Sequence, residues 1–372
     1  MKRVMGIINL YENEALIQEI TEHRPLAAVP FAGRYRLIDF ILSSMVNSGI
    51  QNIGILVKNK SRSLMDHLRS GKEWDLARKR DGLFILPAAH TIAGAGKGNG
   101  DVENFQHNLD YIESSRQKYV LISNSHTICN MNYRKVFQFH ENTGADITIV
   151  YKDQDPGSDD FTGCTMLETT EDGRVVDLAV NPAKYTSSKV SMDMYLMKKE
   201  LLVDIISGCY ARGGVDFLKD GLIKNLDRLK IYAYQHRGFV ARINSVASYY
   251  RHNMDLLKPE KWQELFVKSG LIYTKVKDEA PAKYKENAKV SNAMVANGCI
   301  IEGSVENSVL FRGVKVHKGA CVKNSIIMQK CEIAANAIVE NVICDKDVMI
   351  TTGKWLKGDQ TYPLVIEKGT VI

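Results

Sequence analysis

One short pattern repeats near the C-terminal end at a step of 17 residues: Val305-Glu306-Asn307-Ser308-Val309, Val322-Lys323-Asn324-Ser325-Ile326 and Val339-Glu340-Asn341-Val342-Ile343. Val316, Ile333 and Ile350 keep the same step, and Gly313 and Gly319 stand at expected corners. A period of about 17 to 18 residues, made of three short strands, is typical of one coil of a left-handed parallel β-helix with hexapeptide repeats. Its aliphatic side chains point inward. We predict this architecture from Lys289 onward.

The first 150 residues have a different pattern. Short apolar runs at residues 3–8, 53–57, 119–123 and 146–151 are typical of strands covered on both faces. Helical spacing separates them, as in residues 37–45 and again through Phe105, Leu109 and Ile112. Alternating strands and helices predict a parallel three-layer α/β sheet. We therefore expect an α/β domain at 1–240, a helical joint at 241–288 and a β-helix domain at 289–372.

Composition excludes several classes of protein. The 372 residues are 45% hydrophobic and 25% charged, which does not fit a disordered or fibrous chain. A net charge of +6 without a dense basic run argues against nucleic acid binding. The chain has no apolar stretch that would span a membrane and no signal peptide pattern, so we expect a cytoplasmic protein. Seven cysteines without a C-x-x-C pair predict reduced, mostly buried thiols.

A family resemblance rests on one long block, Val29-Pro30-Phe31-Ala32-Gly33-Arg34-Tyr35-Arg36-Leu37-Ile38-Asp39-Phe40. It resembles the V-P-F-G-G-K-Y-R-I-I-D-F block of the ADP-glucose pyrophosphorylase (glucose-1-phosphate adenylyltransferase) family. Residues 47–50, 191–195, 216–220 and 249–257 extend the resemblance over nearly the whole chain. It implies an N-terminal nucleotidyltransferase-like (Rossmann-like), mostly parallel three-layer domain followed by a left-handed parallel β-helix. The family's enzymes join ATP to glucose 1-phosphate, releasing pyrophosphate and forming ADP-glucose for glycogen or starch.

The family's nucleotide-binding loop is altered in this chain. Its G-G-x-G-T-R-L pattern reads Leu10-Tyr11-Glu12-Asn13-Glu14-Ala15-Leu16, so every glycine is lost and Ala15 stands at the arginine position. Glycines let backbone N–H groups approach phosphates. Two like charges about 4 Å apart repel by about 4 kcal/mol at an effective dielectric constant near 20, so Glu12 and Glu14 should oppose a triphosphate.

The resemblance also implies that both magnesium ligands are lost. His126 stands at one aspartate position and Arg242 at the other. Mg²⁺ prefers hard oxygen ligands, and a guanidinium repels a divalent cation. We therefore expect no cofactor in this chain, and Mg²⁺ only in a catalytic homologue. His126 could instead bind another metal or be a hydrogen-bonded structural residue, and Arg242 could bind a phosphate or fill the vacated pocket through a salt bridge.

Two further blocks depart from the family pattern. Val180-Asn181-Pro182 replaces E-K-P, and Gly100-Asp101-Val102-Glu103 replaces G-T-A-D. The lysine of the family's K-P-A-V-P-F block is also missing, because Leu26 stands there, although Arg24 lies two residues earlier. Several separate functional blocks are changed, whereas the residues that define the fold are kept. This pattern predicts a chain that no longer catalyses the reaction. We assign no catalytic residue.

Other residues are candidates for regulation or ligand binding. In the family, the basic block that matches Arg34, Tyr35 and Arg36 lies near the regulator and the subunit contacts. Arg36 and Asp39 could equally form an ordinary stabilising pair at a helix start. Further candidates are Lys97 in the glycine-rich loop 93–100, which is either a lid or an unstructured loop, and Asp193 and Lys219 in the retained blocks.

These observations predict a regulatory, non-catalytic subunit in glycogen biosynthesis. It would assemble with a catalytic subunit of ADP-glucose pyrophosphorylase into a heterotetramer, or with itself as a homo-oligomer, and respond to a phosphorylated metabolite. One alternative is an active or rewired sugar-1-phosphate nucleotidyltransferase. Another is a stand-alone sensor that binds a sugar phosphate without turnover.

Overall fold

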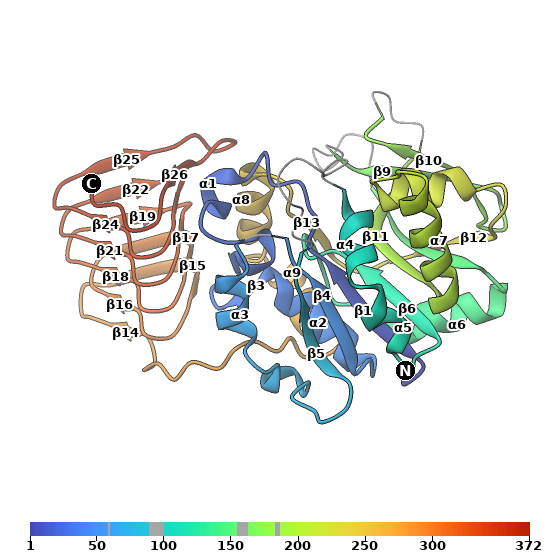
Figure 1. Cartoon of the computed structure of the whole chain (residues 1–372). Helices are drawn as coiled ribbons and strands as arrows, with labels where there is room; N and C mark the ends of the chain where they lie inside the picture. The colour runs from blue at the N-terminus through green and yellow to red at the C-terminus, as the bar shows by residue number, and fades with distance from the viewer. Residues whose placement is uncertain (59, 89–99, 155–162, 183–186) are drawn as a thin grey trace. The chain divides into compact units, whose positions relative to one another are not determined.

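The computed structural model describes residues 1–372 except 59, 89–99, 155–162 and 183–186. It contains two compact units that interleave along the chain (Figure 1). Unit 1 comprises Met1–Glu12, Phe40–Val240 and Ser269–Ile272, and unit 2 comprises Asn13–Asp39, Ala241–Lys268 and Tyr273–Ile372. A linear division at 1–240, 241–288 and 289–372 does not anticipate that Asn13–Asp39 groups with the C-terminal segments.

Unit 1 is built on a nine-stranded sheet. Its main path runs β10-β9-β11-β6-β1-β4-β5, and β8 pairs with both β11 and β12. The strands are β1 (Val4–Asn9), β4 (Asn52–Leu56), β5 (Gly82–Leu86), β6 (Tyr119–Ser123), β8 (Ile147–Asp153), β9 (Thr165–Thr169), β10 (Val175–Val180), β11 (Lys189–Lys198) and β12 (Ile231–Gln235). The strands β5, β4, β1 and β6 are parallel, as the alternating pattern predicts. Beyond them the sheet is mixed, because β11 runs antiparallel to β6, β8 and β9.

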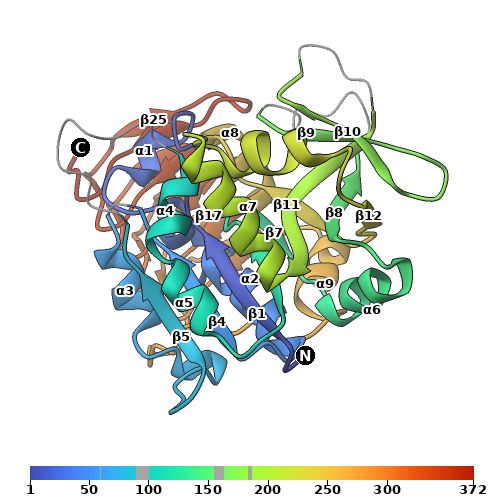
Figure 2. The same cartoon turned by 45° about the vertical axis from the view of Figure 1, so that its right-hand side comes forward.

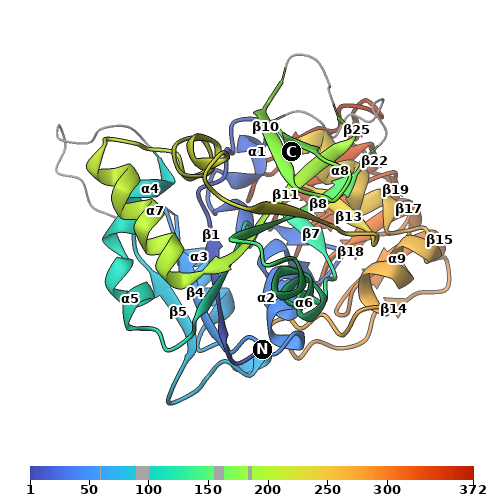
Figure 3. The ribbon, with the colours of Figure 1, turned by 90° about the vertical axis from the view of Figure 1, so that its right-hand side faces the viewer.

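Helices cover both faces of this sheet (Figures 2 and 3). They are α2 (Leu37–Asn47), α3 (Arg62–Leu68), α4 (Asp101–His107), α5 (Leu109–Ser114), α6 (Tyr133–Thr143) and α7 (Lys199–Ala211). On β1, Met5 and Ile7 join the core formed with α4, α5 and α7. Gly6 points to the other face, where a Cβ would lie 2.6 Å from Met45 Sδ of α2. The single helix predicted through Phe105 is two helices, which meet at Asn108.

The β-helix of unit 2 has the predicted periodicity. Parallel pairing joins Ser304 to Cys321, Cys321 to Ile338 and Ile338 to Trp355, a constant step of 17 residues. One early coil is shorter, because Lys289 pairs with Ser304, and Ile300 with Lys315, at a step of 15. The strands, stacked coil on coil in Figure 1, are β14 (Lys283–Tyr284), β15 (Lys289–Val295), β16 (Ile300–Ile301), β17 (Ser304–Leu310), β18 (Lys315–Val316), β19 (Cys321–Lys323), β20 (Ile326–Ile327), β21 (Glu332–Ile333), β22 (Ile338–Glu340), β23 (Val342–Cys344), β24 (Met349–Ile350), β25 (Trp355–Lys357) and β26 (Leu364–Ile366). This agrees with the left-handed hexapeptide β-helix expected from the sequence.

The repeated residues have two structural roles. The aliphatic members of the repeat are buried in the interior, as predicted: Val305, Val316, Val322, Ile333, Val339 and Ile350. The repeated asparagines turn a corner with positive φ angles of 44° at Asn307, 45° at Asn324 and 54° at Asn341. Asn307 Nδ2 also donates a hydrogen bond to Asn324 Oδ1 at 2.7 Å. Asparagine tolerates this backbone conformation better than most residues, so the repeat specifies both the interior and the corner.

The remaining elements of unit 2 attach residues 13–39 to the rest of that unit. They are α1 (Gln18–Thr21), β2 (Pro30–Phe31), β3 (Tyr35–Arg36), α8 (Val246–Asp255) and α9 (Pro259–Phe266). Tyr249 Oη donates a hydrogen bond to the Pro30 carbonyl at 2.7 Å. Arg24 forms a buried ion pair with Asp345 of the β-helix. These contacts explain why Asn13–Asp39 clusters with unit 2.

Two predictions from composition can be compared with the structure. All seven cysteines lie in the described residues, none forms a disulfide, and six are buried. Among the helices in the described ranges, none combines the length and apolar character that a membrane crossing requires.

Candidate functional site

The carboxyl end of β1 carries an acidic contact. Asn9 Nδ2 donates a hydrogen bond to Asp101 Oδ2 at 3.0 Å, and the Phe217 N–H donates to Asp101 Oδ1 at 2.8 Å. Burial, with a smaller contribution from the carboxylate of Asp216, raises the pKa of Asp101 to about 6 against the opposing effect of the two hydrogen bonds. Ligands of open α/β sheets bind beyond the carboxyl ends of the strands, so an acid stands at the edge where a nucleotide would lie.

The acidic loop after β1 turns onto the segment that follows β6. Glu12 Oε1 accepts hydrogen bonds from the Ser125 N–H at 2.5 Å and from Ser125 Oγ at 2.7 Å. The Glu12 side chain is only 6% exposed. Further along the loop, Glu14 Oε1 accepts a hydrogen bond from the Leu26 N–H at 2.7 Å, and Ala15 is exposed. The residues at the position of the family's phosphate loop therefore make internal contacts.

His126 lies between two carboxylates of unit 1. Its Nδ1 is 3.7 Å from Glu12 Oε1, and its Nε2 is 3.6 Å from Asp193 Oδ2. Within the described ranges, neither ring nitrogen has a hydrogen-bond partner. The choice between a metal ligand and a structural residue at His126 therefore stays a prediction. Asp193 has a positive φ of 53°, at the point where the pairing of β11 with β8 shifts register. No local sequence pattern indicates this juxtaposition, because it depends on that bulge.

The described residues contain no group of three or more His, Cys, Asp or Glu side chains that could hold a metal ion. Arg242 is buried in β13 (Val240–Arg242) of unit 2. Whether Arg242 binds a phosphate or fills the vacated pocket through a salt bridge stays a prediction.

Two other predicted candidates lie apart from this cluster. Lys219 is exposed in the short helical segment η4 (Phe217–Leu222), where its N–H donates to Asp216 Oδ1 at 2.9 Å. Lys97 lies outside the described residues. The structure therefore assigns neither lysine a ligand contact.

A second candidate site belongs to unit 2 and contains the predicted basic block. The Arg34 guanidinium lies over the ring of Tyr35, 5.5 Å from its centroid, and Tyr35 stacks on Phe266 at 5.0 Å. The Arg36 N–H donates a hydrogen bond to Asp39 Oδ2 at 2.9 Å. This contact through the backbone caps the start of α2.

Sequence reasoning missed three cations near this block: Lys277, Arg312 and Lys346. Burial, together with the nearby Arg36 and Arg24, lowers the pKa of Lys346 to about 7, while Asp345 opposes the shift. Burial and the Arg34 guanidinium lower the pKa of Arg312, and burial, Arg312 and Arg36 lower that of Lys277. We call Arg34, Arg36, Lys277, Arg312 and Lys346 the basic cluster.

Mutual repulsion of these cations means that a bound anion would be favoured there. One signal could have found two of them. Arg312 and Lys346 are 34 residues apart, two coils of the 17-residue step. Equivalent positions of a β-helix form a column, so the spacing places both cations on one side of it.

Comparison with known proteins agrees with the family resemblance seen in the sequence. Residues 17–262 match the model of the "Nucleotidyl transferase" family, and residues 279–362 match "GlmU-like, C-terminal hexapeptide". The chain is 41% identical to the "Glycogen biosynthesis protein GlgD" of Bacillus subtilis and 43% identical to that of Geobacillus stearothermophilus; each match covers 99% of this chain and 97% of the relative. It is 31% identical to the "Glucose-1-phosphate adenylyltransferase" of Bacillus mycoides, over 94% of this chain and 93% of that protein.

Proposed function

The chain belongs to the nucleotidyl transferase family, in the branch that contains the glucose-1-phosphate adenylyltransferases, and we propose that it is a regulatory subunit of that enzyme in glycogen biosynthesis. In this proposal it has no adenylyltransferase activity of its own. It assembles with a catalytic homologue and changes the activity or the effector response of that homologue.

The observation that carries the proposal is the placement of Glu12. A phosphate-binding loop offers backbone N–H groups to the ligand. Here the carboxylate of Glu12 accepts the N–H and the hydroxyl of Ser125, so a buried anion occupies contacts next to β1. Asp101 places a second acid at the carboxyl end of the same strand. Both acids oppose the negative charge of a triphosphate.

His126 supports the same conclusion for the metal. Mg²⁺ binds oxygen ligands in near-octahedral geometry, and an imidazole is a poor replacement for a carboxylate. The ring nitrogens of His126 lie 3.7 Å from a Glu12 oxygen and 3.6 Å from an Asp193 oxygen, so an imidazole stands between these two carboxylates. Metal ions supply several kcal/mol of transition-state stabilisation, and each loss of about 1.36 kcal/mol slows a reaction tenfold.

Features of unit 2 support assembly and regulation. A solenoid ends in unpaired strand edges that must be capped or covered. The last coil exposes Trp355, at 68%, and Leu364, at 38%, which suits coverage by another subunit. The basic cluster suits a phosphorylated effector, which can regulate a partner if it binds the active and less active assemblies with different free energies.

The proposal is tested by assaying pyrophosphate release from ATP and glucose 1-phosphate. The chain alone should show no turnover above the blank, and adding it to a catalytic homologue should raise the rate or shift the effector response. Size-exclusion chromatography should show a mixed oligomer. Strong activity of the isolated chain would overturn the proposal, and so would two subunits that neither assemble nor influence each other.

The role of the basic cluster has its own test. The double variant Arg312→Met with Lys346→Met should weaken the response of the mixed oligomer to a phosphorylated effector at least tenfold. The control, Lys354→Met with Lys368→Met, removes the same charge from exposed positions of the β-helix unit. Equal responses of the two double variants would exclude the basic cluster as the effector site.

A second candidate function is a rewired nucleotidyltransferase. It is favoured by the two carboxylates, Glu12 and Asp193, that flank His126. Calorimetry with Mn²⁺ and with ATP separates the two functions. Binding of both ligands, lost in Glu12→Gln, would favour the rewired enzyme.

A further inference from the structure

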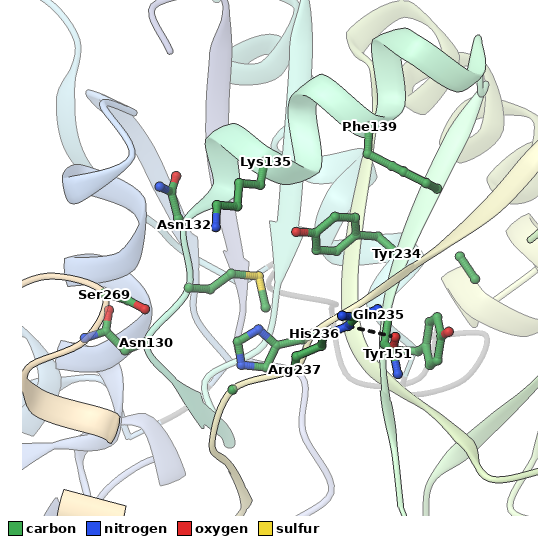
Figure 4. Close-up of a pocket in the computed structure, with 13 residues that line it drawn as sticks. Asn130, Asn132, Lys135, Phe139, Tyr151, Tyr234, Gln235, His236, Arg237 and Ser269 are labelled. Carbon is green, nitrogen blue, oxygen red and sulfur yellow. Dashed lines mark hydrogen bonds between the residues drawn. The ribbon is translucent and has the colours of Figure 1, made fainter. Parts of the chain in front are cut away.

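Unit 1 contains a pocket that none of the residues discussed so far lines. It has a volume of about 550 Å³ and lies among the first turns of α6, the strands β8 and β12, and the turn at residues 236–238 (Figure 4). Pockets of about 300 to 1,000 Å³ typically hold small organic ligands. The residues Glu12, His126 and Asp193 are not part of it.

The pocket is positively charged. Lys135 of α6 and Arg237 of the turn line it, and no aspartate or glutamate is among its lining residues. Arg237 Nε donates a hydrogen bond to Gln235 Oε1 at 3.3 Å, which orients its guanidinium. Throughout the described chain, no carboxylate forms a salt bridge with either cation. The carboxylate of Asp153 lies nearby, because it accepts a hydrogen bond from Gln235 and acts on Tyr151 together with Arg237. It pairs with neither cation, so an anionic ligand is still favoured.

The turn that holds Arg237 is fixed by hydrogen bonds to β8. The His236 N–H donates to the Tyr151 carbonyl at 2.8 Å, and Lys152 Nζ donates to the Gly238 carbonyl at 2.9 Å. Burial and the Lys152 cation lower the pKa of His236 to about 4, so its imidazole is neutral near pH 7. The positive charge of the pocket therefore comes from Lys135 and Arg237, on a preformed wall.

Aromatic side chains form the other wall. Tyr234 of β12 and Phe139 of α6 are in edge-to-face contact, with ring centroids 5.4 Å apart, and Tyr151 of β8 also lines the pocket. Figure 4 shows Lys135 and Tyr234 reaching into the space beside His236. Burial raises the pKa of Tyr234, and the Arg237 guanidinium opposes that shift, so the phenol stays protonated near pH 7 and can donate a hydrogen bond. This wall suits a planar ring or the apolar face of a sugar.

We propose that this pocket binds a small phosphomonoester. Its phosphate lies between Lys135 and Arg237, and its organic part packs against Tyr234 and Tyr151. A phosphomonoester carries a charge of about −1.5 to −2 near pH 7, which matches the two cations. Charge-assisted hydrogen bonds from a guanidinium and an ammonium are the strong contacts that such a group requires.

Calorimetry on the full chain tests the proposal with three probes: adenosine 5′-monophosphate, glucose 6-phosphate and inorganic phosphate. We expect at least one of the two organic phosphates to bind at least tenfold more tightly than inorganic phosphate. The tighter of the two identifies the organic part as a base or a sugar. On binding, amide exchange should slow in residues 130–139 and 231–238, which separates this pocket from the basic cluster of unit 2.

Two sets of variants complete the test. Lys135→Met with Arg237→Met should weaken binding of the organic phosphate at least tenfold. The control, Lys79→Met with Arg80→Met, removes the same charge from exposed residues of unit 1 and should leave binding unchanged.

The second variant keeps all charges. A Cβ at residue 238 would lie 2.8 Å from His236 Nε2, so Gly238→Ala must displace the ring and should weaken binding several-fold. No binding of any probe, binding that survives loss of both cations, or exchange protection confined to unit 2 would overturn the proposal.

Discussion

Replacing Asp101 by asparagine should stabilise unit 1 at neutral pH and have less effect in acid. Asp101 is partly enclosed at the carboxyl end of β1, where burial raises its pKa from 3.8 to about 6. The folded state therefore binds this proton more tightly than the unfolded state. Its contribution to stability is fully present below pH 3.8 and is lost as the pH rises through about 6.

The size of the effect follows from the shift. A difference of about two pKa units, at about 1.36 kcal/mol each, is an upper value of about 3 kcal/mol. In Asp101→Asn, the amide oxygen can still accept the Phe217 N–H. The new NH₂ group can donate to Asn9 Oδ1, which has no partner in the part of the chain that the structure describes. Asn9 Nδ2 then loses its acceptor, so we expect a net gain of about 1 to 2 kcal/mol at pH 7.5.

Urea unfolding of the full chain between pH 4.5 and 8 measures this gain, with the fluorescence of buried Trp74 reporting on unit 1. Glu103→Gln is the control, because it also removes an acid from the first turn of α4 and shares any loss of interaction with the helix dipole. The difference between Asp101→Asn and wild type should grow with pH up to about 7 and then level off. A constant difference across this range would refute the reasoning.

Three further predictions concern unit 2. Arg24→Met leaves Asp345 as an unpaired buried charge and should cost about 3 to 5 kcal/mol in denaturant unfolding, most of which Asp345→Leu in the same chain should restore. Asn324→Ala loses a side-chain hydrogen bond of the corner and strains a φ of 45°, so it should cost about 2 kcal/mol, whereas Asn324→Gly should cost less because only the hydrogen bond is lost. Tyr249→Phe removes the donor to the Pro30 carbonyl and should lower the free energy of unfolding by about 1 to 2 kcal/mol, without changing the oligomeric state measured by light scattering.

The β-helix could be predicted because its coils repeat along a single axis. Every coil must place aliphatic residues at the same positions, so Val305, Val322 and Val339 repeat at the step of 17 that the pairing of strands also shows. The parallel half of the sheet was predictable for a related reason, since strands covered on both faces are continuous apolar runs. The 15-residue step from Lys289 to Ser304 was not, because the sequence match that defines the repeat begins only at Val305.

The candidate sites were less predictable because they depend on contacts between distant segments. The resemblance identified His126 as a replaced ligand, but its position between Glu12 and Asp193 depends on the bulge in β11. Likewise, the basic block at Arg34 was recognised, whereas Lys277 comes from a stretch without regular structure and carries no pattern. Side chains that meet only through tertiary folding leave no local period for a sequence argument to use.

The two candidate sites carry opposite charges, and this difference explains how one chain could lose catalysis and keep regulation. The edge of β1 holds the acids Glu12 and Asp101, whereas unit 2 holds cations that depress one another's pKa, with that of Lys346 lowered to about 7. Catalysis needs many groups placed correctly at once, so a few changes at the β1 edge are enough to abolish it. Regulation needs only a difference in binding free energy between two states of an assembly, which a single intact anion site can supply. A chain can therefore lose the first property and keep the second. If the proposed function is right, the basic cluster is the feature whose removal should abolish the regulatory effect.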